Sequence, residues 1–293
     1  MSIVLAFACA VIYGVADYCG GRASRTMLST MVTLIGQASS LVVGVGAVAL
    51  LADPSPGVRD WAWGSVAGVA SAVALGSFYH ALSHGAMTVV APITAVTSAA
   101  LPVAYGLISG DRPKVMAYAG MALAVAAVAL VSGAVGTRHE HARRSTVVLA
   151  FAAGLGFAII FVALGRTSKS SGMWPLVASR ITSVILITGF VLVMRARSSK
   201  TRAGGAGASP LPPMRLWGLA ALAGALDMSA NFFYLLAVRR GMLSIVVVVA
   251  SLYPISTVCL AFGLDRERVS KSQAAGMVLA VGALVLVSAG SVA

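Results

Sequence analysis

The residues of this chain that are best suited to chemistry are polar side chains inside long apolar runs. Asp227 lies near the middle of one run, and Asn231 and Tyr234 follow four and seven residues later. On a helix this spacing places a carboxylate, an amide and a phenol on one face. Such a stripe cannot face lipid, so it either contacts a substrate and serves a coupling ion, or only fixes helix packing. We expect the first role.

Arg180 lies eight residues into another apolar run. A guanidinium at that depth lines a water-filled cavity, pairs with a carboxylate, or snorkels to the nearer interface. Arg180 therefore holds either an anionic group of a substrate or a carboxylate partner such as Asp227. Gln37 occupies the matching position of an earlier run, at a shift of 143, and is a weaker candidate.

Aromatic and acidic residues elsewhere extend this set of candidates. Tyr13 and Asp17 are four residues apart in the first apolar run, and Asp17 lies near its end with Arg22 close by in sequence. Solvation at the membrane interface explains Asp17 as well as function does. Tyr253 precedes a proline in a late run and could form an aromatic wall of a ligand site.

Prolines interrupt two of the apolar runs. Pro92 and Pro102 lie in one run and Pro254 lies in another, and the two runs match each other in the repeat described below. A proline removes a backbone hydrogen bond, and the freed carbonyl can line a cavity or a hinge. Prolines are also common in membrane helices without such a role. We expect helix breaking and gating at these three positions.

Signals for catalysis or metal binding are weak. An intramembrane enzyme needs a nucleophile with a base nearby, and the pair Ser77 and His80 lacks a Gly-X-Ser elbow and an orienting acid. His139 and His141 lie in a polar connection with no further ligand nearby in sequence. We therefore predict no enzyme, no metal and no cofactor.

The composition indicates a membrane protein. Of the 293 residues, 59% are hydrophobic and 10% are charged, and the mean hydropathy is +0.95. A soluble protein of this length could not cover its surface with so few charges. The net charge of +13 does not indicate nucleic-acid binding, because the Lys and Arg residues form short clusters between apolar runs, where they would meet lipid headgroups.

The apolar runs predict an all-α polytopic membrane protein. A spanning helix needs about 20 mostly apolar residues. Ten runs fit, at residues 3–21, 29–52, 61–82, 86–108, 115–135, 146–165, 173–194, 215–238, 242–263 and 272–292. The uncharged stretch 61–110 is too long for one span, and the step from His84 to Gly85 is its natural break.

The two halves of the chain repeat each other. Residues 61–132 align on 217–288 without a gap at a shift of 156, and the start of each half aligns at a shift of 144. Five spans per half is an odd number, so the halves would insert with opposite orientation. The sequence thus predicts two inverted five-helix repeats, 1–137 and 146–293, with a linker at 138–145.

The loop charges bear on orientation. If the N-terminus is cytoplasmic, the inner loops carry seven Lys and Arg residues and the outer loops carry thirteen. The positive-inside rule therefore favours an N-terminus outside the cell.

The chain combines ten predicted spans and an internal repeat with one local motif in the ninth run. Pro254 in the ninth run is followed thirteen residues later by Glu267 and then by Arg268. In these features the chain resembles the drug/metabolite transporter superfamily, EamA-domain type, over essentially its whole length. The first repeat departs from the family pattern, since Ser98 stands at the proline position and Asp111 replaces the glutamate.

The resemblance implies a central cavity lined by the first, third, fourth, sixth, eighth and ninth spans. It would place the following residues at or near that cavity: Tyr13, Asp17, Asp227, Asn231, Tyr234 and Tyr253. It also implies that both termini are cytoplasmic, against the loop charges, and we follow the family on this point.

These features predict a secondary transporter. We expect it to export a small metabolite, amino acid or drug-like compound across the bacterial cytoplasmic membrane by alternating access of the two repeats. Protons are a candidate coupling ion, membrane lipids are partners, and the protein is a monomer or homodimer. The alternative is a non-transporting scaffold or lipid-binding protein, and an intramembrane enzyme is the least favoured reading.

Overall fold

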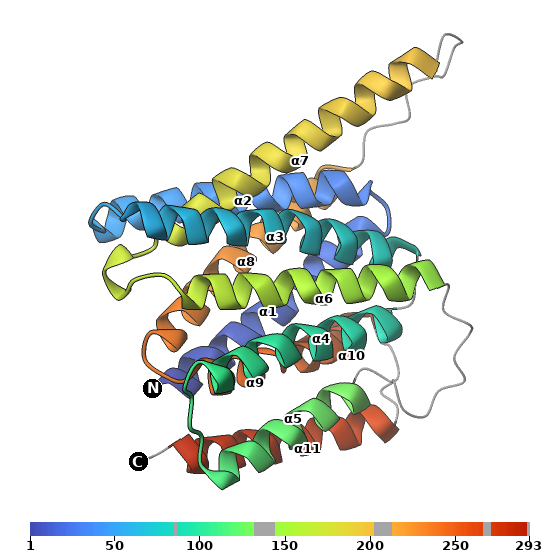
Figure 1. Ribbon diagram of the computed structural model, residues 1–293. Coiled ribbons are helices and arrows are strands. Elements are labelled where there is room, and N and C mark those ends of the chain that lie inside the picture. The colour runs from blue at the N-terminus through green and yellow to red at the C-terminus, as the bar shows by residue number, and fades with distance from the viewer. Residues whose placement is uncertain (85–86, 132–143, 202–212, 266–270, 292–293) are drawn as a thin grey trace.

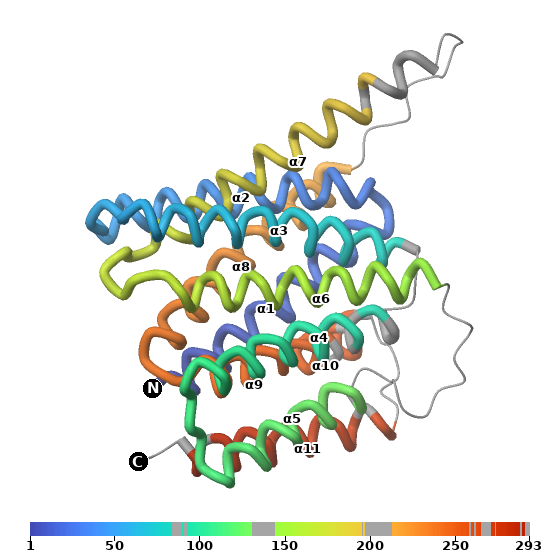
Figure 2. The backbone as a smooth tube through the Cα atoms, viewed as in Figure 1, coloured from blue at the N-terminus to red at the C-terminus, as the bar shows by residue number. Residues whose placement is uncertain are grey.

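The computed structural model describes residues 1–84, 87–131, 144–201, 213–265 and 271–291, and in these residues it contains helices but no strand (Figures 1 and 2). The helices are α1 (Ser2–Ser24), α2 (Ser29–Leu51), α3 (Val58–His84), α4 (Met87–Ile108), α5 (Val115–Val131), α6 (Arg144–Gly165), α7 (Trp174–Thr201), α8 (Met214–Val238), α9 (Leu243–Ala250), α10 (Tyr253–Asp265) and α11 (Lys271–Ser291). A short 3-10 helix, η1 (Lys169–Ser171), precedes α7.

Most of these helices are long and apolar enough to cross a membrane. Among the described residues, seven helical segments meet that criterion, with α9 and α10 counted together as Leu243–Leu264. Three shorter apolar helices lie in the fourth, fifth and tenth predicted runs, at Ile93–Ile108, Val115–Leu130 and Ala274–Val287. The expectation of an all-helical, multi-pass membrane protein is confirmed.

The helices stack in layers that mix the two halves of the chain (Figure 1). Helix α1 packs on α8, and α3 packs on α6 and α7. On the other side α4 packs on α6, α1 packs on α10, and α5 pairs with α11. Helix α7 diverges from α2 and α3 towards its C-terminal end (Figure 1). Helices from both halves therefore surround the centre of the molecule.

The connections between helices lie at two ends of the bundle. Both termini lie at one end (Figure 1), with the connections 52–57, 109–114, 166–173 and 239–242. We call this the N-terminal end. The opposite end holds the connection 25–28 between α1 and α2 and the start of α8 (Figure 1).

Glycine permits the closest approach between helices of the two halves. A Cβ atom on Gly224 of α8 would collide with the backbone oxygen of Gly36 on α2. At the crossing of α3 and α7, a Cβ on Gly68 would collide in the same way with the backbone oxygen of Ser179. Small residues allow such contacts in a membrane, where lipid supplies no hydrophobic drive for association.

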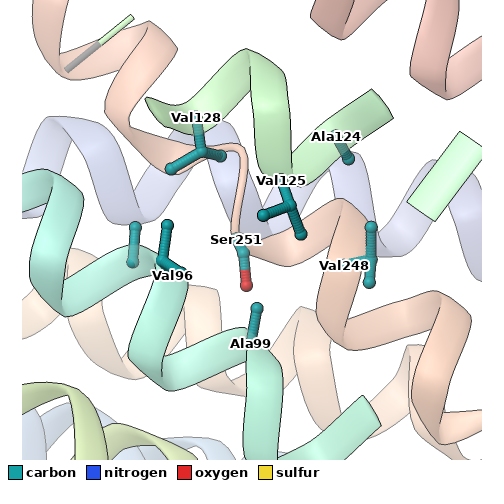
Figure 3. Close-up of a pocket in the computed structure, with 8 residues that line it drawn as sticks. Val96, Ala99, Ala124, Val125, Val128, Val248 and Ser251 are labelled. Carbon is teal, nitrogen blue, oxygen red and sulfur yellow. The ribbon is translucent and has the colours of Figure 1, made fainter. Parts of the chain in front are cut away.

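The ninth predicted run is two helices rather than one. Helix α9 ends at Ala250 and α10 begins at Tyr253, with Ser251 and Leu252 forming a turn. Pro254 has no N–H to continue the ladder from α9, so it favours a break at this point. Beside the break, a cavity of about 10 Å³ lies between α4, α5 and α9, with Ser251 in its wall (Figure 3). It is only large enough for about one water molecule.

The prolines of the fourth run behave differently. Helix α4 continues through both Pro92 and Pro102, so neither position interrupts the helix in this structure. A proline inside a helix removes one hydrogen bond without ending the helix when neighbouring helices hold the segment. Helix α4 is held in this way, since Thr94 Oγ1 donates to the backbone oxygen of Ala150 on α6 at 3.1 Å.

Candidate functional site

The centre of the bundle contains a buried ion pair. Arg180 on α7 donates from one terminal nitrogen to Asp227 Oδ2 on α8 at 2.6 Å. The Arg180 side chain is 3% exposed and that of Asp227 is 13% exposed. The structure therefore brings together two of the predicted site residues and realises the carboxylate pairing that was one of the roles considered for Arg180. The snorkelling alternative does not describe this geometry.

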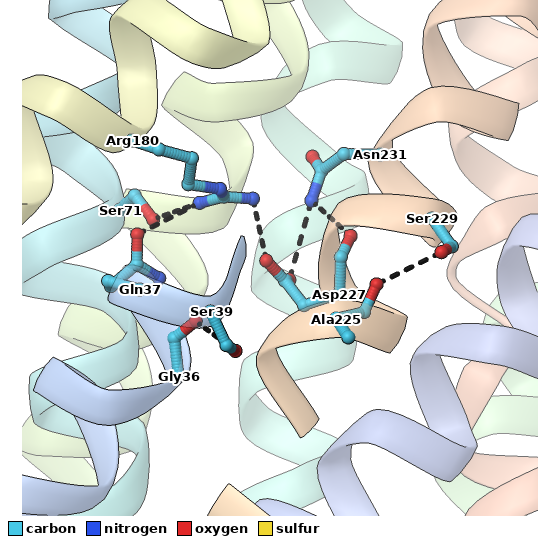
Figure 4. A network of polar contacts seen from close by, with 9 residues as sticks. All are labelled: Gly36, Gln37, Ser39, Ser71, Arg180, Ala225, Asp227, Ser229 and Asn231. Atoms are coloured by element: carbon cyan, nitrogen blue, oxygen red, sulfur yellow. Dashed lines mark hydrogen bonds and ion pairs between the residues drawn. The ribbon is translucent and has the colours of Figure 1, made fainter. Parts of the chain in front are cut away.

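Two further partners of Arg180 come from the first half of the chain. Its other terminal nitrogen donates to Gln37 Oε1 on α2 at 3.1 Å and to Ser71 Oγ on α3 at 2.9 Å, as Figure 4 shows. Both partners are 1% exposed. The guanidinium thus joins four helices, two from each half. A buried cation with three polar partners is much less costly than an isolated one.

The partners of Arg180 follow the sequence repeat. Gln37 matches Arg180 itself at the shift of 143, and Ser71 matches Asp227 at the shift of 156. Two equivalent positions from each half therefore meet in one network. Ser71 was not among the predicted site residues, although applying the shift of 156 to Asp227 would have identified it.

Of the three residues predicted to share a polar face on α8, only Asp227 and Asn231 contact each other. Asn231 Nδ2 donates to the backbone oxygen of Asp227 at 2.8 Å and to Asp227 Oδ1 at 3.4 Å (Figure 4). Tyr234 instead donates to the backbone oxygen of Phe161 on α6 at 2.9 Å, and its ring stacks on the Phe161 ring at 4.7 Å. Tyr234 therefore packs α8 against α6, while Asn231 orients Asp227.

Asp17 is a second buried carboxylate. It is 9% exposed, and no described residue forms a hydrogen bond or an ion pair with it. The carboxylate lies close enough to Asp227 for the two negative charges to repel each other. The phenols of Tyr79 on α3 and Tyr253 on α10 also lie near enough to interact electrostatically with Asp17. Arg22, close in sequence, donates to Tyr18 at 2.9 Å.

Tyr13 and Tyr253 are two further buried residues of the predicted site. The Tyr13 ring meets the Phe161 ring edge-on at 6.3 Å between centroids. Tyr253 is 6% exposed, and its hydroxyl has no hydrogen-bond partner among the residues that the structure describes. Among the described residues, five other buried polar atoms also lack a partner: Arg180 Nε, Ser183 Oγ, Asn231 Oδ1, Ser40 Oγ and, at the N-terminal end, Arg239 Nε. Donors and acceptors that the protein itself does not satisfy are available for a small polar ligand.

Carboxylates hold the connections of the N-terminal end together. Asp60 accepts from the backbone N–H and the hydroxyl of Ser168, both at 2.7 Å. Asp53 accepts from the N–H of Met173 at 2.7 Å. Asp111 accepts from the N–H and hydroxyl of Ser244 at 2.9 and 2.8 Å. These contacts close α2, α3 and α4 onto the starts of η1, α7 and α9, where a negative charge is favourable.

Arg239 completes this closure. One terminal nitrogen donates to the backbone oxygens of Ser168 and Gly172 at 3.1 and 2.8 Å and to Ser171 Oγ at 3.0 Å. Partial burial lowers the pKa of this guanidinium, and the nearby charges of Asp53 and Asp60 oppose that shift. Gly172 has a φ of +53°, which side chains disfavour, and it lies against the Asp53 carboxylate, which leaves no space for a Cβ atom. Both the backbone conformation and the packing therefore require glycine at this position.

Several predicted features lie outside the described residues. These are Glu267 and Arg268 of the local motif, and His139 and His141 of the loop pair. Within the described part of the chain, no group of three or more His, Cys, Asp or Glu side chains is placed to hold a metal ion. Asp111, which takes the place of the family's glutamate in the first repeat, is described and caps α9.

Comparison with known proteins matches this architecture to a family. Residues 144–289 match the model of the EamA-like transporter family. One solved structure, described only as the crystal structure of a protein, is similar with a TM-score of 0.73 and 15% sequence identity. The likeness covers 98% of this chain and 96% of the other, and at that identity it shows the fold alone. A comparison with curated proteins finds no match.

Proposed function

Since the chain belongs to the EamA-like transporter family of membrane proteins, we propose that it is a secondary transporter that exports a small polar or amphiphilic molecule through the centre of the bundle. The observation that carries this proposal is the buried network of Arg180, Asp227, Gln37 and Ser71. Polar groups in a membrane interior are costly and mark substrate or ion pathways. The membrane in question is the bacterial cytoplasmic membrane.

The transport mechanism is alternating access of two inverted five-helix repeats, with ten spans and repeat boundaries at 1–137 and 146–293. Equivalent contacts support this arrangement. Gly224 closely approaches Gly36, and Gly68 closely approaches Ser179. Gly68 matches Gly224 at the shift of 156, and Gly36 matches Ser179 at the shift of 143, so the two contacts are equivalent in the repeat. A pseudo-twofold relation of this kind lets one half rock against the other around a fixed site.

The N-terminal end is the closed side of this cycle. Asp53, Asp60, Asp111 and Arg239 tie four connections to one another there. Opening that end would require these hydrogen bonds to separate together. Of the prolines, Pro254 is the best candidate for a hinge, because the chain already breaks beside it. Gating roles for Pro92 and Pro102 would require α4 to bend in another state.

Asp17 is the proposed coupling carboxylate. Asp227 already has Arg180 as its counterion, whereas the described groups that face Asp17 are the carboxylate of Asp227 and the phenols of Tyr79 and Tyr253. A buried carboxylate without a counterion is stable only with a proton or a bound cation. Proton binding and release at Asp17 would therefore accompany substrate movement, with Tyr13 in the adjoining wall.

A ligand screen tests the proposed site. The purified protein would be heated with amino acids, sugars, nucleotides, phosphates and cationic drugs, and the unfolding temperature recorded. A ligand at about 100 times its dissociation constant adds about 2.7 kcal/mol of stability. We expect a stabilising ligand whose effect disappears in Asp227→Asn and Arg180→Gln. A ligand that stabilises all three proteins equally would show that the network is not its binding site.

The scaffold alternative makes a different prediction. A non-transporting scaffold has no need for a polar centre, so its binding partners would be insensitive to Asp227→Asn. Equal flux of the identified ligand with and without protein in liposomes would favour that alternative.

A further inference from the structure

A groove of about 660 Å³ lies between α2, α3, α6 and α7, away from the ion-pair network. It follows the side on which α7 diverges from α2 and α3 (Figure 1). The volume is within the range of about 300–1,000 Å³ that is common for small-molecule sites. None of the residues discussed above as substrate or coupling residues lines it.

The lining of the groove is mostly apolar, and along α3 it changes from polar to apolar. Ser29 and Thr30 of α2 and His80 of α3 line it near the opposite end of the bundle. Val69 and Val73 of α3 line it nearer the middle. One helical wall therefore begins with a polar side chain at the rim and becomes aliphatic with depth. This gradient fits an amphiphile whose headgroup lies at the rim.

The length of the groove matches one leaflet of a bilayer. From Val69 to His80 the helix rises roughly 16 Å, at about 1.5 Å per residue. That distance is about half of the roughly 30 Å hydrocarbon core. Phe190 on α7, which is 54% exposed, supplies an apolar wall on the facing side. An acyl chain would run along α3 and α7 without crossing the midplane.

The charge at the rim selects the headgroup. Arg25 lies four residues before Ser29 and is exposed, and its side chain has no hydrogen-bond or ion-pair partner among the described residues. Among the described residues, Arg22 in the last turn of α1 and Arg215 at the start of α8 also lie at this end of the bundle. Cationic side chains beside the end of a span attract anionic headgroups.

We propose that this groove is a binding site for an anionic phospholipid, with the acyl chain between α3 and α7 and the phosphate beside Arg25, Ser29 and Thr30. The site does not depend on the proposed substrate pathway, because it shares no residue with the ion-pair network.

Gly76 allows the groove to be filled without disturbing the fold. It lines the groove, and a Cβ added there would meet no other atom within 4 Å. Gly46, on α2 but outside the groove lining, is equally open and provides the matched control. In Gly76→Leu the new side chain would take the place of part of the acyl chain, whereas Gly46→Leu would leave the groove free.

The experiment is native mass spectrometry of the detergent-purified protein titrated with phosphatidylglycerol and with phosphatidylcholine of the same chains. We expect saturable binding of phosphatidylglycerol that is about tenfold weaker in Gly76→Leu and unchanged in Gly46→Leu, since about two methylene contacts are lost. In Arg25→Gln the preference for phosphatidylglycerol over phosphatidylcholine should disappear. Helical circular dichroism and unfolding temperature establish that each variant is folded.

Three results would overturn the proposal. Equal binding of both lipids to the wild type would indicate only nonspecific surface lipid. Unchanged phosphatidylglycerol binding in a folded Gly76→Leu protein would place the lipid elsewhere. Loss of ligand-induced stabilisation in Gly76→Leu with lipid binding intact would assign the groove to the transported substrate. None of these results would by itself contradict transport through the network, which is tested separately by Asp227→Asn.

Discussion

At the scale of single residues, two carboxylates in the centre of the bundle, Asp227 and Asp17, have different surroundings. Asp227 has a guanidinium at 2.6 Å and an amide that donates to it, whereas Asp17 has no such partner among the described residues. The difference lies in the helices that surround each residue, since α7 brings Arg180 to Asp227 and no basic residue of the described helices reaches Asp17. The same substitution at the two positions should therefore have different effects on stability.

Asp17→Asn should leave the unfolding temperature unchanged or raise it, by the equivalent of about 1 kcal/mol, because a neutral amide no longer has to take up a proton or a cation to be buried without a counterion. Asp227→Asn should lower it, because Arg180 would then be a buried cation without its counterion. Thermal unfolding of both variants in one detergent measures the contrast. A fall of similar size in both would show that Asp17 has a stabilising partner in the folded protein.

The Arg180–Asp227 pair should also show strong coupling. Arg180→Gln alone should destabilise the protein by about 3–5 kcal/mol, since it leaves the Asp227 carboxylate buried and uncompensated. The double variant Arg180→Gln with Asp227→Asn should be more stable than Arg180→Gln alone, because no unpaired charge remains. A double-mutant cycle from unfolding curves measures this coupling. Additive effects would mean that the two charges do not interact in the folded state.

At the scale of helices, backbone approach at glycine sets the packing of the two halves. In Gly224→Ala the added methyl group would collide with the backbone of α2 at Gly36, which should cost about 1–3 kcal/mol. Gly218→Ala on the same helix meets no atom within 4 Å and should instead gain up to about 1 kcal/mol from helix propensity. Unfolding temperatures of the two variants should move in opposite directions; equal shifts would contradict the close crossing.

The apolar runs predicted the helices well, and the repeat predicted which positions correspond. Runs of apolar residues report burial in lipid directly, so the step after His84 could be located from sequence. The turn at Ser251 and Leu252 was not predicted in position, because a proline alone does not say whether a helix bends, as in α10, or continues, as in α4.

The structure brings only some of the predicted site residues into contact with one another. The pairing of Arg180 with Asp227 was one of the alternatives, but the roles of Ser71, Asp53 and Asp60 were not anticipated. Each of these depends on a partner more than a hundred residues away. No local pattern reports such a partner, and only the repeat shift pointed to Ser71. Tyr234 was grouped with Asp227 from its spacing, whereas its hydroxyl bonds to the backbone of α6.

At the scale of the whole molecule, the closed N-terminal end should control access to the centre. Arg239→Gln removes the donor that holds the connection 166–173 to that of 239–242, so this end should open more often. Cys9 on the N-terminal half of α1 is fully buried and reports the opening by its reaction with a water-soluble maleimide. Cys19, near the other end of α1, reports the opposite side.

In a Cys259→Ser background, which removes the exposed thiol, Arg239→Gln should raise the labelling rate of Cys9 relative to Cys19. Arg240→Gln is the matched control, because the side chain of this neighbouring arginine is exposed and has no hydrogen-bond partner among the described residues. An equal rise in both variants would indicate a general effect of lost charge rather than a released closure.

The most direct test of the account is flux of the ligand found in the thermal screen into liposomes that contain the purified protein. We expect saturable uptake by the wild type that is lost in Asp227→Asn and retained in Gly46→Leu, with both variants folded. Uptake by Asp227→Asn at the wild-type rate would contradict the claim that the buried network of the two halves is the transport site.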